Sequence, residues 1–211
     1  MKTNAHQFLE TSFGYDLSQR VLAYFLSKKS VKELSKRLKK VFAKNVLDIG
    51  CATAFYRDDI PVKNFTGIDI SNDFIKTAKK RFPGDKFFVM DSANLTFPKD
   101  TFDTVISKGV LHHLPEKKLI KSIKESLRVT RRKGHVIILD AIQPIDSWNI
   151  FGKFLRNLDQ GHNILHSSDY KSLLKKHFIL DEFKIYSSFP YDICIYTISK
   201  SKNPFSTSKP Q

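Results

Sequence analysis

The sequence predicts an α/β protein built on a doubly wound, mostly parallel sheet. Short apolar runs, which are typical of buried strands, recur at residues 45–50, 65–70, 86–90, 102–108 and 135–141. Helical patterns with an N-cap serine or a first-turn proline lie between some of these runs, at residues 71–82 and 114–130. Strands that alternate with helices in this way imply right-handed crossovers and parallel pairing.

The pattern changes after the fifth strand. A helical pattern at residues 167–178 is followed by two more strand patterns at 179–188 and 191–199, which are joined only by Phe189 and Pro190. A link this short pairs strands antiparallel, so we expect the sheet to end in a C-terminal antiparallel hairpin.

Three parts are expected in the 211 residues, a length that suits one globular domain. Residues 1–43 are predicted to form an N-terminal helical cap, because apolar residues recur there at helical spacing. Residues 44–200 are predicted to form the main domain, with an aromatic-containing insertion at 142–166. The polar residues 201–211 have the composition of a disordered tail.

The composition, with 41% hydrophobic and 27% charged residues, is that of a soluble globular protein. No apolar run approaches the ~20 residues of a membrane span, and the N-terminus lacks a signal-peptide pattern, so a cytoplasmic location is expected. Cys51 and Cys194 lie far apart without metal-ligand spacing, which predicts free thiols and no metal site. The net charge of +15 has two interpretations. The favoured one is a solvated, lysine-rich helix face over residues 28–44, and the alternative is a surface that binds nucleic acid.

Acidic residues follow three successive predicted strands. Asp48 ends the first strand, Asp69 the second and Asp91 the third. A single aspartate after a strand is usually a turn former, but three at neighbouring strand ends point into one crevice, where open α/β sheets bind ligands. Asp69 lies 19 residues after Gly50, close to the ~20 expected for a carboxylate that binds ribose hydroxyls. Asp91 and the adjacent Ser92 offer an acceptor and a backbone N–H for the edge of an adenine.

The loop after the first strand excludes phosphate-rich cofactors. A dinucleotide fingerprint would need glycine where Phe55 stands, and phenylalanine there would obstruct close packing of helix on strand. A P-loop is excluded because no Gly-Lys-Ser/Thr follows. A nucleoside cofactor without phosphates fits the loop better.

Four segments together resemble the successive motifs of class I S-adenosylmethionine-dependent methyltransferases, in the branch called type 11: VLDIGCATAFY, FTGIDIS, FVMDSANLTFPKDTFDTVIS and GVLHHL. The resemblance implies a Rossmann-like seven-stranded sheet whose last strand is antiparallel, and S-adenosyl-L-methionine as the cofactor. Its methionyl part would contact Asp48, Gly50, Cys51, Ala52 and the loop to Ala54, and its amino group the backbone at Ser107. Its ribose would bind Asp69, and its adenine Ile70, Asp91, Ser92 and Ala93.

The first motif departs from the family pattern Asp-x-Gly-x-Gly-x-Gly, because Ala52 and Ala54 replace its last two glycines. Alanine makes a positive φ costly, by an amount of order 1 kcal/mol. With an ordinary backbone the loop would only be tighter, whereas a left-handed path would reshape it and weaken the cofactor affinity. A catalytically silent relative of the family therefore stays an alternative.

The acceptor is expected beside the fourth strand and the insertion. His112 and His113 are the candidate general bases for a hydroxyl acceptor, with a structural role as the favoured alternative for both. Trp148, His162 and Tyr191 are candidates for the substrate side. The sequence has no Asn/Asp-Pro-Pro-Tyr segment and no Pro-Cys nucleophile after the fourth strand. The resemblance therefore favours a small-molecule or lipid-linked acceptor, with RNA methylation through the basic face as the alternative.

Overall fold

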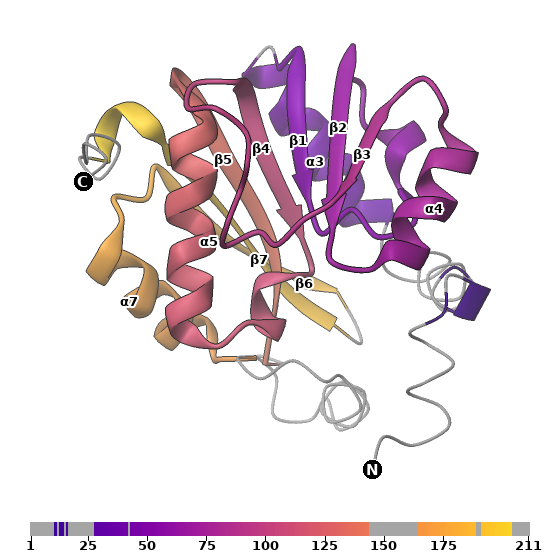
Figure 1. Ribbon diagram of the computed structural model, residues 1–211. Helices are drawn as coiled ribbons and strands as arrows, with labels where there is room; N and C mark the ends of the chain where they lie inside the picture. Colours follow the sequence, from indigo (N-terminus) through magenta and orange to yellow (C-terminus); the bar gives the residue numbers. More distant parts are fainter. Residues whose placement is uncertain are drawn as a thin grey trace.

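The computed structural model describes residues 11, 13–14, 16, 28–41, 43–143, 164–188 and 191–203 (Figure 1). Seven strands form one sheet in the order β3-β2-β1-β4-β5-β7-β6. These strands are β1 Asn45–Ile49, β2 Asn64–Asp69, β3 Lys86–Val89, β4 Phe102–Lys108, β5 Thr130–Ile142, β6 Glu182–Ser188 and β7 Tyr191–Ser199. The first five strands pair parallel, and β7 pairs antiparallel with both β5 and β6. The predicted doubly wound sheet with a C-terminal hairpin is therefore confirmed.

Helices cover both faces of this sheet (Figure 1). Their bounds are α3 Lys28–Lys40, α4 Asn72–Arg81, α5 Glu116–Val129 and α7 Ser167–His177. One core cluster contains buried residues of α5 and α7, and the other contains buried residues of α3 and α4. The alternation of side chains along β1 feeds both clusters, because Val46 joins the α3 side while Leu47 and Ile49 join the α5 side.

Strand β5 is longer than its predicted range of 135–141. It begins at Thr130, which pairs with Phe102, and its register shifts before Thr104. Gly134 lies inside the strand instead of before it. A Cβ at this position would come within 2.3 Å of the Asp103 carbonyl oxygen. The close approach of β4 therefore requires glycine at this position, and the sequence pattern hid the first part of the strand.

Ordered structure also extends past the predicted start of the tail. One turn of 3₁₀ helix spans Lys200–Lys202, and the buried Asn203 side chain receives the Ile179 amide at 2.8 Å and donates to the Ser199 carbonyl at 2.8 Å. Residues 144–163 of the predicted insertion, with Trp148 and His162, lie outside the described residues. None of the helices in the described part of the chain is long and apolar enough to cross a membrane.

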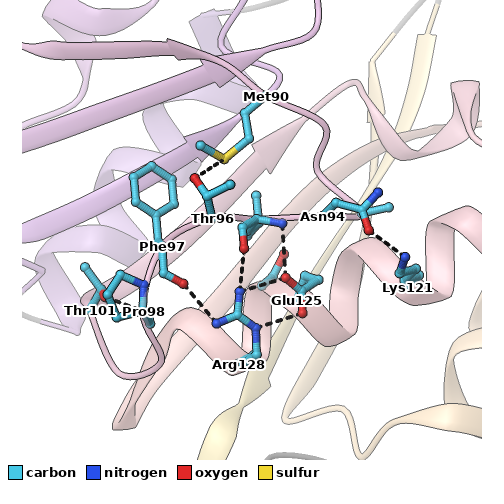
Figure 2. A network of polar contacts seen from close by, with 12 residues as sticks. Met90, Asn94, Thr96, Phe97, Pro98, Thr101, Lys121, Glu125 and Arg128 are labelled. Atoms are coloured by element: carbon cyan, nitrogen blue, oxygen red, sulfur yellow. Dashed lines mark hydrogen bonds and ion pairs between the residues drawn. The ribbon is translucent and has the colours of Figure 1, made fainter. Parts of the chain in front are cut away.

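The connection from β3 to β4 is held against α5 by two charged side chains. Figure 2 shows Arg128 and Glu125 of α5 turned toward this connection. Arg128 donates to the carbonyls of Leu95 at 2.7 Å and Phe97 at 2.9 Å, while Glu125 accepts the Leu95 amide at 3.1 Å and pairs with Arg128. The network therefore holds this connection against the C-terminal half of α5.

We predict that Arg128→Met destabilises the protein by roughly 1–3 kcal/mol, because two carbonyls and the Glu125 carboxylate lose a charged donor. Urea denaturation measures this loss, and Lys117→Met, on the exposed side of α5, is the matched control. Equal stability of the two variants would contradict the role of the network.

Candidate functional site

The carboxyl ends of four parallel strands bring the predicted site residues to one edge of the sheet. Register pairs Ile49 with both Ile68 and Ser107, and it pairs Asp69 with Val89. The residues that end β1, β2 and β4, and those that follow β3, therefore lie side by side at the point where strand order reverses. The set at this edge contains Asp48, Gly50, Cys51, Ala52, Asp69, Ile70, Asp91, Ser92, Ala93 and Ser107.

The loop after β1 follows a left-handed path at every second residue. The φ angles are 69° at Gly50, 47° at Ala52 and 57° at Ala54. Glycine is required at position 50 for two reasons. Its φ is positive, and a Cβ there would come within 2.3 Å of the Val110 side chain. Of the two alternatives left open by the sequence, the left-handed path is the one adopted. Ala52 and Ala54 thus adopt a backbone conformation that suits glycine, and this conformation is strained for alanine.

Internal hydrogen bonds hold this strained loop. The amides of Gly50 and Cys51 both donate to the Ile68 carbonyl, at 2.8 and 2.9 Å, and the Ala54 amide donates to Cys51 at 2.9 Å. The Ala52 amide donates to Oδ2 of Asp69 at 3.0 Å. The amides of all three left-handed residues are therefore satisfied within the protein.

Asp69 joins the loop to the start of α4. Its Oδ1 accepts the Ser71 amide at 2.9 Å, while the Ser71 side chain caps the helix by accepting the Phe74 amide at 3.3 Å. Burial raises the pKa of Asp69, and the amides of Ser71, Ala52 and Ile70 oppose this shift. A carboxylate has about four acceptor positions, so Asp69 keeps capacity for at least one ribose hydroxyl.

The N-terminal segment also reaches the loop. The Thr53 hydroxyl donates to Asp16, and Arg81 of α4 donates both to Asp16 and to the Thr53 carbonyl, the latter at 3.0 Å. Thr53 is itself buried. This contact places residue 16 of the predicted cap against the loop.

The β2–β3 side of the edge offers an apolar surface beside a carboxylate. The Ile70 side chain is 72% exposed although it follows a buried strand, and an adenine ring would cover such a surface. Asp91 accepts the Ala93 amide at 3.0 Å and pairs with Lys118 of α5 at 2.9 Å. Burial works to raise the pKa of Asp91, but the Ala93 amide and Lys118 outweigh it and lower that pKa.

The β1–β4 side contains a pocket lined by charges of both signs. Asp48, Gly50, Cys51, Ala54, Tyr56 and Lys108 are among the residues that line it. Burial raises the pKa of Asp48 to about 7, and Lys108 opposes that shift. Burial likewise lowers the pKa of Lys108 to about 8 against the attraction of Asp48. Lys108 ends the fourth predicted strand, but no role was assigned to it from the sequence. A lysine at the end of a buried strand is the feature that could have marked it as a site residue.

His112 and His113 differ sharply in their surroundings. His112 is 3% exposed, and its Nδ1 pairs with the Asp140 carboxylate of β5. Asp140 also accepts a hydrogen bond from the Tyr170 hydroxyl at 2.8 Å. The Tyr170 hydroxyl in turn lies 3.2 Å from the Tyr196 hydroxyl. His113 is exposed and stacks on His112 with ring centroids 4.0 Å apart. The network of His112 fits a structural role, while His113 is open to solvent.

Of the residues predicted on the substrate side, only Tyr191 lies in the described part of the chain. Its backbone begins β7 and pairs with Ser188 of β6, beside the end of β5 where Ile142 pairs with Asp192. Tyr191 therefore stands at the same edge of the sheet as the strand ends of the site.

These residues fit a nucleoside that carries an amino-acid end. Asp69 keeps acceptor capacity, Ile70 offers an uncovered apolar face, and the pocket under the loop is lined by charges of both signs. The Ser107 hydroxyl at the end of β4 is buried without a hydrogen-bond partner in the described residues, as expected beside a polar ligand.

Comparisons with known proteins agree with this geometry. The family model described as "Methyltransferase domain" matches residues 47–138. Demethylmenaquinone methyltransferase of Thermotoga maritima is 28% identical over 134 residues, which cover 62% of this chain and 58% of that protein. Probable tRNA methyltransferase 9B of Mus musculus is 36% identical over 94 residues, which cover 44% of this chain and 21% of that protein. The chain thus matches little more than half of the first relative and about a fifth of the second.

Solved structures show the same fold. The N-methyltransferase NodS of Bradyrhizobium japonicum, in complex with S-adenosyl-L-homocysteine, aligns with a TM-score of 0.64 at 19% identity, covering 87% of this chain and 90% of that one. The methyltransferase solved with the Trm112 activator of Haloferax volcanii aligns with a TM-score of 0.68 at 12% identity, covering 94% and 99%. Over residues 47–138 the chain is therefore similar to the methyltransferase domain. The matched segment confirms the predicted resemblance to the class I S-adenosylmethionine-dependent methyltransferases.

We predict that Ala52→Gly and Ala54→Gly each stabilise the protein by roughly 0.5–1 kcal/mol. A left-handed alanine costs about 1–2 kcal/mol, which exceeds the roughly 0.4–1 kcal/mol that glycine adds to the unfolded chain's entropy. Thermal and urea unfolding measure the change. Ala93→Gly, at a buried loop position outside the left-handed region, is the control and should destabilise. A loss of stability in the two loop variants as large as that in Ala93→Gly would contradict the left-handed path.

Proposed function

We propose that this chain binds S-adenosyl-L-methionine and transfers its methyl group to a small-molecule or lipid-linked acceptor. The observation that carries the proposal is the left-handed loop of residues 50–54 tied to Asp69 at the switch point of the sheet. The bound cofactor would supply an activated methyl group on a sulfonium sulfur. The protein's own part is to hold the cofactor and the acceptor in line and to exclude water.

The roles of the cofactor-site residues follow from their places along the edge. Asp69 would accept the ribose hydroxyls, with Ile70 against the adenine face and Asp91, Ser92 and Ala93 at the adenine edge. The backbone at Ser107 and the loop from Gly50 to Ala54 would meet the methionyl part. This assignment gives neither histidine a part in binding the cofactor.

A general base is needed only for an acceptor that must lose a proton. His113 is the better candidate of the two histidines, because it is exposed beside the end of β4 while Nδ1 of His112 is held by Asp140. Tyr191, whose backbone begins β7 at this edge of the sheet, stays the candidate for the acceptor side. The match to demethylmenaquinone methyltransferase, which covers more of this chain than the match to tRNA methyltransferase 9B, supports a small-molecule acceptor.

Calorimetry with S-adenosyl-L-homocysteine tests the cofactor proposal. Wild-type protein should bind this product, and Asp69→Asn should weaken binding roughly 10- to 100-fold, because charge-assisted hydrogen bonds to the ribose are lost. Asp58→Asn, an exposed carboxylate beyond the loop, is the matched control. Failure of the wild type to bind at millimolar ligand would instead support a silent relative of the family.

RNA is the second candidate acceptor, favoured by the net charge of +15 and by the basic face of α3. Small-molecule methylation predicts weak RNA affinity with little dependence on salt. Fluorescence anisotropy with a labelled RNA hairpin, between about 50 and about 200 mM salt, separates the two. Affinity that falls by orders of magnitude over this range, and that drops when lysines of α3 are changed to glutamine, would favour RNA.

A further inference from the structure

Lys108 is a cation in a pocket that the fold keeps partly closed. It ends β4, the strand beside β1, and its side chain shares the pocket with Asp48. Its Nζ lies 3.9 Å from the centroid of the Tyr56 ring, a cation–π contact that orients the ammonium. Burial lowers the pKa of Lys108 to about 8, which reflects the cost of keeping this charge out of water.

The loop over this pocket has few donors left for an anion. The amides of Gly50, Cys51, Ala52 and Ala54 all donate to protein oxygens. A carboxylate that entered beneath the loop would therefore need a side-chain cation instead of the loop amides.

Arg57 also lines the pocket, but its guanidinium is engaged elsewhere. Its Nη2 donates to Asp85 at 3.2 Å and its Nη1 to the Ile60 carbonyl at 3.0 Å, while Nε also donates to Asp85. Of the two cations in the described pocket lining, Arg57 is held by Asp85 and Ile60, which leaves Lys108 to meet an entering anion.

We propose that Lys108 binds the carboxylate at the amino-acid end of the cofactor, while Asp48 in the same pocket receives the ammonium of that end. The inference rests on the proposed function, and it adds to it a residue that determines recognition of the methionyl group. A zwitterion brings one charge of each sign, so each buried group gains an opposite partner. This lowers the cost of the two buried charges that the free protein carries.

A structural role for Lys108 makes a different prediction. If the ammonium only neutralised Asp48, its loss would disturb every ligand of the site in the same proportion. If Lys108 binds the carboxylate, its loss matters only for ligands that have one. 5′-Methylthioadenosine keeps the nucleoside and lacks the amino-acid end, so it separates the two roles.

Calorimetry with both ligands on four proteins tests the proposal: wild type, Lys108→Met, Lys108→Arg and the exposed-lysine control Lys99→Met. We expect Lys108→Met to bind S-adenosyl-L-homocysteine at least about tenfold more weakly, as loss of one charged hydrogen bond implies. The same variant should bind 5′-methylthioadenosine as the wild type does. Lys108→Arg should keep most of the affinity for both ligands, and Lys99→Met all of it.

Three results would overturn the inference. If Lys108→Met bound S-adenosyl-L-homocysteine as tightly as the wild type, Lys108 would not contact the carboxylate. If it lost both ligands equally, the lysine would be structural, and retention of both by Lys108→Arg would confirm that the fold survives. Failure of the wild type to bind either ligand would overturn the proposed function itself and this inference with it.

Discussion

The carboxylate of Asp69 is the interaction on which the rest of the site depends. One of its oxygens holds the amide of Ala52 and the other holds the amide of Ser71, so a single side chain joins the left-handed loop to the start of α4. Strain of the kind stored at Ala52 and Ala54 persists only where the surroundings fix the backbone. Asp69 supplies that constraint, and Asp16 and Arg81 add to it through Thr53. The loop therefore keeps the course of a glycine-rich cofactor loop without the last two of its glycines.

Two buried charges mark the other half of the site. Asp48 and Lys108 both have pKa values displaced toward neutrality by burial, which means that the folded protein holds them at a cost. Apolar residues at both positions would serve the core better, as replacements of buried ion pairs often do. Charges retained in a pocket at the end of parallel strands are more readily explained by a ligand with matching charges than by the fold.

The sequence predicts the sheet and the cofactor edge well, because both depend on local patterns. Apolar runs that end in Asp48, Asp69 and Asp91 place three carboxylates at neighbouring strand ends once the strands pair in parallel. It does not predict contacts between distant residues, such as those of Asp140 with His112 and Tyr170, because no periodicity records side-chain direction across 28 and 30 residues. The sign of φ at Ala52 was equally hidden, since alanine ordinarily avoids the left-handed region. The early start of β5 was missed because Gly134 resembles a turn and instead permits a close strand contact.

The most direct test of the central claim is a crystal structure of the protein grown with S-adenosyl-L-homocysteine. The account predicts nucleoside density between Asp69 and Ile70, with positive φ angles at Ala52 and Ala54 and both oxygens of Asp69 still bound to the loop and to α4. Density at another place, or a loop that reverts to negative φ at both alanines, would contradict it.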